Sequence, residues 1–337
     1  MAQPRIRAGL SGFSGGITRY FAGRLRSRLT GRSGVLLLFA LLWVIPVSRG
    51  ADDSDVEMVA AAEFKGEGLC RFSLHEYQLP ARNEAAINRV VSEALKKHEK
   101  LFAFKAASNF HVRVRIFGRF ADFEQYTRTN RNARKFVQAR QSLTNLGGYY
   151  SQRDNQVVTW RQRHPTHLAN TLLHEASHAI LHTAYRRVPM WLSEGSATYF
   201  AYPRGIQDEK DVGNLQYRWA KLNVLLRAKQ LPSPRTVLNW REDEWLGLDP
   251  GLTYTVAWSM FQLLMSTPQK QDGLQKYLRE LQRLPRRQTG PTDLAEVFAP
   301  LYPGGIEQLE KDWHAWIAKG GARVLGPEMD ELLKQVR

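Results

Sequence analysis

The sequence predicts an α+β fold, in which a small layer of strands and helices is followed by a mainly α-helical part. Residues 110–117 alternate apolar and polar side chains as a β-strand does, and residues 147–160 have the pattern of a β-hairpin. Beyond residue 200, apolar side chains instead recur at the three- and four-residue spacing of amphipathic helices. We therefore expect four regions: a leader (1–50), an α/β part that ends in a hairpin (51–160), a pair of helices (161–204) and a helical subdomain (205–337).

The leader is strongly basic and carries one apolar run. Residues 1–50 contain eight arginines and no acidic residue, and the apolar run covers residues 35–47. This run is shorter than the ~20 residues that a membrane-spanning helix needs. A basic segment before a short apolar run is typical of a secretory signal peptide, here with cleavage before Ala51, so we expect export. A mitochondrial transit peptide and an uncleaved anchor, which would keep the protein at the membrane, are the alternatives.

The α/β part is expected to alternate strands and helices after a loose lead-in over residues 51–64. The expected elements are a strand (71–79), a helix (83–104), a half-buried strand (110–117), a polar helix (122–141) and a hairpin with its turn at Asp154-Asn155. In the half-buried strand, Phe110, Val112, Val114 and Ile116 share one face, and His111, Arg113 and Arg115 share the other.

The remaining segments are expected to be helical. Helices begin after Pro165-Thr166 and at Pro189, where proline suits the first turn. The first of these has a stripe of apolar residues at helical spacing, namely Leu168, Leu172, Ala176, Ala179 and Ile180. Further helices are expected over residues 214–229, where a proline-rich stretch follows, and over 254–264, 273–284, 293–298 and 306–317.

The helix after Pro165 contains the pattern H-E-x-x-H, formed by His174, Glu175 and His178. Positions i and i+4 lie one turn apart on the same helix face, so both imidazoles can bind one metal ion. Glu175 is rotated by about 100° from His174. Its carboxylate then lies beside the metal, where it can accept a proton from a metal-bound water. The alternative is a helix with two surface histidines and a glutamate.

A catalytic zinc site needs a third protein ligand and an open position for water. Glu194, on the expected helix after Pro189, is the candidate. The small residues 195–197 that follow it would let this helix approach the first helix closely. His182 lies one turn beyond His178, but three ligands on one straight helix cannot converge on a tetrahedral ion. We therefore expect His182 in a supporting or surface position.

The segment from Trp191 to Tyr199 has the pattern W-L-x-E-G-x-A-x-Y. Together with H-E-x-x-H, it resembles the gluzincins, zinc peptidases with a thermolysin-like catalytic fold. The closer resemblance is to their peptidase-MA-like bacterial branch, and the segment is also similar to the corresponding element of aminopeptidase N. The resemblance extends from about Gly147 to about Trp316. It implies a zincin-like α/β layer with an edge strand and a metal helix.

The resemblance also implies roles for single residues. His174, His178 and Glu194 would bind Zn²⁺, and Glu175 would be the general base. Tyr254 matches a tyrosine that can donate a hydrogen bond to the oxyanion of the tetrahedral intermediate, although packing within the helix bundle is an equal alternative. With the leader, the resemblance leads us to expect a location in the bacterial periplasm, in the cell envelope or outside the cell.

In zincins, the strand just before the metal helix lies at the sheet edge and pairs with extended substrate. By resemblance, this strand is Val157–Trp160. The chain departs from the pattern at Thr198, where thermolysin-type enzymes have an aspartate that orients a histidine. It also has no counterpart of the G-A-M-E-N segment of aminopeptidases. Because position 198 is a threonine, a different group must orient the ligand histidine.

The charge balance bounds the partners. The chain has 48 Lys+Arg and 32 Asp+Glu, and without the eight arginines of the leader 40 basic residues remain, a net charge of +8. Such a surface favours acidic partners, but it has no stacking platform or nucleic-acid motif, so we expect a solvated basic surface and no nucleic-acid partner. Cys70 is the single cysteine, so no internal disulfide forms, and we expect it to be a packed residue.

The sequence thus predicts a zinc-dependent metallohydrolase, most simply a peptidase that acts on a peptide or protein substrate. It indicates no oligomeric state. One alternative is a catalytically inactive zincin-like protein that binds a peptide or polymer of the cell envelope. Another is a basic polymer-binding envelope protein with no metal dependence. A structural zinc site normally has four protein ligands, whereas the sequence offers three strong candidates, which favours catalysis.

Overall fold

The computed structural model describes residues 63–133, 137, 143–144, 146–163, 165–201, 209–285 and 292–319, with the backbone alone for 165–166 and 209–217. The expected leader (1–50) and most of the lead-in (51–64) lie outside these residues. The described part has a mixed α+β fold, in which a four-stranded sheet is followed by a group of helices. None of its helices combines the length and the apolar character that crossing a membrane requires.

The four strands form a mixed sheet with the order β1-β2-β4-β3. Their bounds are β1 Cys70–His75, β2 Val112–Phe117, β3 Gly148–Ser151 and β4 Gln156–Trp160. β1, β2 and β4 run parallel, whereas β3 pairs with β4 in an antiparallel hairpin. β4 is therefore an internal strand, and the expectation that Val157–Trp160 forms the sheet edge is wrong. β3 lies at the edge instead, on the side of β4 away from β2, and no described strand pairs with its outer side.

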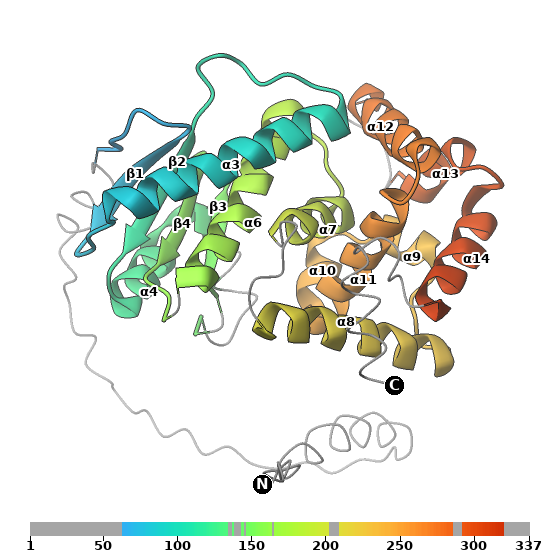
Figure 1. The fold of residues 1–337 in the computed structure, drawn as a ribbon. Coiled ribbons are helices and arrows are strands. Elements are labelled where there is room, and N and C mark those ends of the chain that lie inside the picture. The colour runs from blue at the N-terminus through green and yellow to red at the C-terminus, as the bar shows by residue number, and fades with distance from the viewer. Residues whose placement is uncertain are drawn as a thin grey trace, which may run out of the picture. The chain divides into compact units, whose positions relative to one another are not determined.

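Two long helices cover one face of the sheet, as Figure 1 shows: α3 (Ala81–Phe102) and α6 (Pro165–Ala184). A shared core fills the space between these helices and the strands, and its members include Phe72, Val91, Val114, Ile116, Val157, Leu172, Ala176 and Ile180. The apolar stripe expected on α6 is buried throughout. Each residue of the stripe is at most 7% exposed, so this prediction is confirmed.

The other face of the sheet packs against α4 (Phe120–Thr129), through a second core that contains Phe117, Phe123, Tyr149 and Val158. Because α4 covers this face, β2 is buried on both sides, and the expectation of a half-buried strand is wrong. Arg115, expected on the polar face, is 2% exposed. The helix expected over 122–141 ends at Thr129 and a 3₁₀ turn follows (η1, Arg131–Ala133), while most of the remainder of that segment lies outside the described residues.

The helical part is built around α7 (Met190–Ala201) and α11 (Pro250–Leu264), which are buried along most of their length. Around them lie α8 (Glu209–Arg227), α9 (Pro234–Leu238), α10 (Glu242–Gly247), α12 (Pro268–Arg283), α13 (Leu294–Phe298), the 3₁₀ turn η2 (Ala299–Leu301) and α14 (Gly305–Ala318). The five helices expected beyond residue 205 are present as α8, α11, α12, α13 and α14, with ends shifted by up to five residues. α9 and α10 were not expected.

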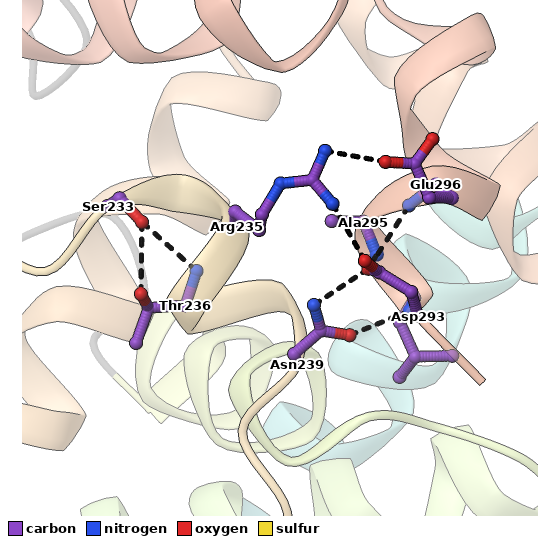
Figure 2. Close-up of polar contacts among 8 residues, drawn as sticks. Ser233, Arg235, Thr236, Asn239, Asp293, Ala295 and Glu296 are labelled. Carbon is purple, nitrogen blue, oxygen red and sulfur yellow. Dashed lines mark hydrogen bonds and ion pairs between the residues drawn. The ribbon is translucent and has the colours of Figure 1, made fainter. Parts of the chain in front are cut away.

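Helix starts in this part follow a simple rule, in which a capping side chain precedes a proline. Ser233, Asp249 and Thr267 accept hydrogen bonds from backbone N–H groups of α9, α11 and α12, each followed by Pro at the first helical position. Figure 2 shows a related device at α13. Asp293 accepts hydrogen bonds from the N–H groups of Ala295 and Glu296, and Arg235 on α9 donates to its second oxygen at 2.7 Å.

Candidate metal centre

The two histidines of the H-E-x-x-H pattern point at one place. α6 is an uninterrupted helix through this segment, so His174 and His178 lie one turn apart. Their Nε2 atoms are 3.3 Å apart, and the imidazole planes are nearly perpendicular, at 83°. Both side chains are mostly buried, with 18% and 9% of their surface exposed. Two imidazole nitrogens this close could both bind one cation.

Glu194 completes the group from α7. Its Oε2 atom is 3.3 Å from Nε2 of His174 and 3.5 Å from Nε2 of His178. The three side chains could hold a metal ion, since their candidate ligand atoms all lie within 4.8 Å of one another. The structure therefore brings together the three residues that the sequence singles out. Burial alone would raise the pKa of Glu194, but the imidazoles of His178 and His174 lower it below its ordinary value.

α7 reaches this position because it is packed between α6 and α11. At Gly195, an added Cβ would lie 2.6 Å from the carbonyl oxygen of Ala257 on α11. The small residue after Glu194 thus allows close contact with α11, and the expectation that it serves the approach to α6 is wrong at this position. Glu194 precedes Gly195 by one residue, so its side chain is rotated by about 100° around the helix axis from the contact with α11. Because a side chain does not fit at position 195, this contact sets how α7 is rotated about its own axis. The rotation in turn sets the direction in which Glu194 points.

Ser193 provides a contact that the sequence reasoning missed. Its Oγ lies 2.9 Å from Nδ1 of His178. A histidine that binds metal through Nε2 carries its proton on Nδ1, so His178 would donate this hydrogen bond. Thr198, at the position of the expected aspartate, is buried, and within the described residues its hydroxyl has no hydrogen-bond partner. The signal available in the sequence was a hydroxyl directly beside the candidate ligand Glu194.

Glu175 lies next to the group without belonging to it. The side chain is buried, and this burial raises the pKa of its carboxyl group, while His174 and His178 lower it in part. The backbone N–H of Tyr150, on β3, also stabilises the ionised form. Glu175 is therefore a carboxylate whose affinity for a proton is higher than in water. It is held between the histidines of α6 and the edge strand.

The edge strand β3 approaches α6 closely. An added Cβ at Gly148 would lie 2.9 Å from Cγ2 of Thr171, one turn before the motif. This contact needs glycine, and it places β3 beside the histidines. His182 stacks on the ring of Tyr150 with 6.2 Å between centroids. It lies outside the group of three, as expected.

Tyr254 comes to the group from α11. Its ring centroid is 6.1 Å from that of His174 and 5.4 Å from that of Trp245 on α10. The side chain is half-buried. α11 begins at Pro250 after the Asp249 cap, and its second turn carries Tyr254. The structure thus places this tyrosine beside the candidate ligands.

His98 lies close to the group but within the core. It is fully buried on α3, stacks on Phe200 of α7 at 3.7 Å and contacts the carbonyl oxygen of Ala94 through Nδ1 at 2.8 Å. Burial lowers its pKa to about 4, and the charge of His178 adds to this effect. His98 is therefore neutral at pH 7. It belongs to the apolar stripe that the periodicity of α3 predicts.

No model of a protein family matches the chain, and no curated protein matches it either. The residues and their geometry are therefore the basis for a functional proposal.

Proposed function

We propose that the protein is a zinc-dependent hydrolase of the gluzincin type, and more particularly a peptidase. The observation that carries the proposal is the triangle formed by His174, His178 and Glu194. Two imidazole nitrogens and one carboxylate oxygen are the ligand types of catalytic zinc sites. Three protein ligands also leave one position of a tetrahedral ion open to water.

The dimensions of the triangle fit this ion. Zinc lies at about 2.0–2.1 Å from such ligand atoms, so neighbouring ligands of a tetrahedral ion are about 3.3–3.4 Å apart. The separations here are 3.3, 3.3 and 3.5 Å. Binding would need little movement of the side chains. The hydrogen bond between His178 and Ser193 supports the same orientation of the imidazole.

The bound ion would supply a Lewis acid that lowers the pKa of a water molecule and polarises a carbonyl group. The chain supplies the remaining chemistry. Glu175 accepts the proton of the attacking water and passes it to the leaving amine. Its raised pKa suits both transfers, because the group must take up the proton and then release it. Tyr254 donates a hydrogen bond to the carbonyl oxygen as negative charge develops there.

The edge strand gives the proposal its substrate class. β3 has no described neighbour on its outer side and lies beside α6. An extended peptide can pair with such an edge through its main chain, which positions a peptide bond beside the metal. This role, first expected for β4, belongs to β3. An extended peptide or protein segment is therefore the proposed substrate.

We also propose that the protein is exported, on the basis of the basic leader and its short apolar run. The bacterial periplasm, the cell envelope and the medium are the locations that follow. The amino-terminal sequence of the protein purified from each fraction tests this proposal. A protein that begins at Met1 in the cytoplasm would contradict it.

The first experiment is a measurement of zinc content in the purified protein and three variants. We expect about one zinc per chain in the wild type and in Glu175→Gln, and a loss in His174→Ala and Glu194→Ala. Peptide hydrolysis, followed with a mixture of fluorogenic peptides, should fall about 10²–10⁴-fold in Glu175→Gln. The retained zinc is the control for folding. No zinc in the wild type, or full activity in Glu175→Gln, would contradict the proposal.

A further inference from the structure

A row of aromatic rings leads from the helical core to the candidate metal centre. Trp240 follows α9, Trp245 lies on α10, Tyr254 lies on α11 and His174 lies on α6. The ring centroids of successive members are 5.7, 5.4 and 6.1 Å apart. These separations lie within the range of about 4.5–7 Å at which aromatic rings attract one another. The row therefore connects the buried tryptophans to a candidate ligand through side-chain contacts.

The angles between the rings make these contacts directional. The planes of Trp240 and Trp245 are inclined at 78°, and those of Trp245 and Tyr254 at 71°. In such an edge-to-face arrangement, the positive edge of one ring meets the negative face of the other. A rotation of either ring weakens this attraction. Trp245 therefore restricts the plane of the Tyr254 ring as well as its position.

Trp245 is itself firmly held. It is 4% exposed, and its neighbour Trp240 is 6% exposed. At the start of α10, the backbone N–H of Arg241 donates to Oε2 of Glu244 at 3.0 Å. At its end, the N–H of Leu248 donates to the carbonyl oxygen of Trp245 at 3.3 Å. The backbone is thus fixed at both ends of this short helix, and burial fixes the indole.

Tyr254 needs such a contact if its hydroxyl is to point in one direction. Its neighbours on α11, Thr253 and Thr255, are 0% and 1% exposed, so the backbone at this point is packed in the core. The backbone fixes where the side chain starts, but not the direction of its ring. A catalytic group must be held within about 0.5 Å and 10–20° of the productive geometry, which requires packing around the side chain itself.

We propose that Trp245 is a positioning residue, which holds the ring of Tyr254 beside the candidate metal ligands. The inference rests on the proposed function, in which Tyr254 donates a hydrogen bond to the carbonyl oxygen of the substrate. Trp245 acts through Tyr254 and takes no part in the chemistry itself. Without the indole, the ring of Tyr254 loses one of its contacts and turns more widely. The hydrogen bond that develops in the transition state is then weakened, while substrate binding is retained.

Fluorine NMR of the full-length protein labelled with 3-fluorotyrosine tests this position without any substrate. The chain contains 12 tyrosines, and Tyr254→Phe identifies the resonance of residue 254. We expect Trp245→Leu to narrow this resonance at least about twofold, because a less restricted ring moves on a faster timescale. Trp245→Phe retains an aromatic ring at this place and should preserve most of the wild-type line width.

Trp316→Leu is the matched control. Trp316 lies on α14 and packs edge-to-face on Trp219 of α8, with 5.4 Å between centroids and 77° between planes. The substitution therefore removes the same side chain, with the same kind of aromatic contact, from another place in the helical part. The line width of Tyr254 should not change. An unchanged line in Trp245→Leu, or equal narrowing in both variants, would overturn the proposal.

Peptide hydrolysis tests the consequence for catalysis. We expect Trp245→Leu to lower kcat about tenfold and to change KM less than about twofold, because the interaction is made in the transition state. In a Tyr254→Phe background, the same substitution should lower kcat less than about twofold, since the phenol is already absent. Zinc content is measured in every variant as the control for an intact metal site. An equal decrease in both backgrounds would mean that Trp245 acts on the fold in general, and it would overturn the proposal.

These outcomes differ from those that test the proposed function. A wild type that hydrolyses no peptide would contradict the proposed function, and this inference with it. An active wild type and an inactive Glu175→Gln, together with full activity in Trp245→Leu, would contradict the inference about Trp245 alone.

Discussion

At the scale of single residues, Ser193 supports the proposed ligand set. Its hydroxyl contacts Nδ1 of His178, the ring nitrogen that points away from the triangle. Partners of this kind fix the tautomer and the orientation of a ligand histidine. Ser193 stands directly before Glu194, so one turn of α7 supplies both a candidate ligand and the group that orients another. No aspartate at position 198 is then required.

Replacing Ser193 by alanine should weaken zinc binding. We expect a loss of about 10–100-fold in affinity, because His178 would lose the hydrogen bond that orients it. Competition with a chelator of known affinity measures the change. Ser196→Ala is the control, since Ser196 is buried on the same helix and its hydroxyl donates to the carbonyl oxygen of Ser193. Equal affinities of the two variants would contradict this role.

His98 should make the stability depend on pH. Burial lowers its pKa to about 4, from 6.5 in the unfolded chain. Above pH 6.5 the imidazole is neutral in both states, so the free energy of unfolding does not depend on this group. As the pH falls from 6.5 to 4, the unfolded state takes up the proton first, and stability falls by up to about 3 kcal/mol.

Urea denaturation at several pH values measures this effect. In His98→Gln, the decrease in the free energy of unfolding between pH 6.5 and 4 should be smaller by the contribution of His98, because glutamine does not titrate. His111→Gln, which changes a less buried histidine, should retain the wild-type slope. An identical pH dependence of the wild type and His98→Gln would show that His98 is protonated without cost.

At the scale of elements, the capping residues connect helices that are far apart in sequence. Asp293 caps α13, and it also accepts a hydrogen bond from Asn239, at the end of α9, at 2.8 Å (Figure 2). Asn239 accepts in return from the N–H of Leu294 at 2.7 Å. These hydrogen bonds lower the pKa of the Asp293 carboxyl group, and the one from Asn239 contributes most. The cap thus ties α13 to α9.

Substitution of Asp293 should separate capping from charge. Asp293→Ala removes the cap and should lower the free energy of unfolding by about 1–2 kcal/mol. Asp293→Asn retains a capping side chain and loses only the exposed pair with Arg235, so it should cost less than about 1 kcal/mol. Chemical denaturation monitored by circular dichroism compares them. If both variants lose the same stability, the ion pair and not the cap would be the source.

Local signals predicted most elements but not all. The periodicity of α3 and the position of Pro165 led to helices whose starts differ from expectation by at most two residues. The short helices α9 and α10 were missed, although Ser233-Pro234 is a helix start by its cap and proline. A helix of five or six residues is too short to show a periodic pattern. Only its packing in the helical core stabilises it.

At the scale of the whole molecule, the triangle connects the two layers of the fold. His174 and His178 belong to α6, which packs on the sheet, whereas Glu194 belongs to α7, which packs in the helical core. A metal ion held by all three would link these layers. Its binding free energy would then add to the stability of the folded protein, because the unfolded chain has no such site.

Removal of the metal should therefore lower the melting temperature. At a metal concentration of 100 times Kd, the stabilisation is about 2.7 kcal/mol, which corresponds to about 5–10 °C for a protein of this size. Calorimetry with and without EDTA measures the shift. Glu194→Ala should show no shift with EDTA. A shift of equal size in that variant would mean that the metal binds elsewhere.

The sequence by itself determined the features that depend on neighbours along the chain. The spacing of His174 and His178 follows from the helical repeat, and the capping residues follow from the chemistry of a helix start. The identity of Glu194 as a partner came from a pattern of residues around it. Each of these is a local property, so no knowledge of distant segments was needed.

Only the tertiary structure decided the features that depend on which segments meet. Alternation along β2 could not reveal that α4 covers its second face, so the burial of Arg115 and the cavity beside it were not foreseen. The position of β4 inside the sheet depends on its pairing with β2, in which Thr159 lies opposite Ile116, 43 residues earlier in the chain. No local pattern encodes such a pairing. The contact between Ser193 and His178 likewise requires α6 and α7 to be packed together. The chemistry of each side chain follows from the sequence, whereas the residues that surround it are set by long-range packing.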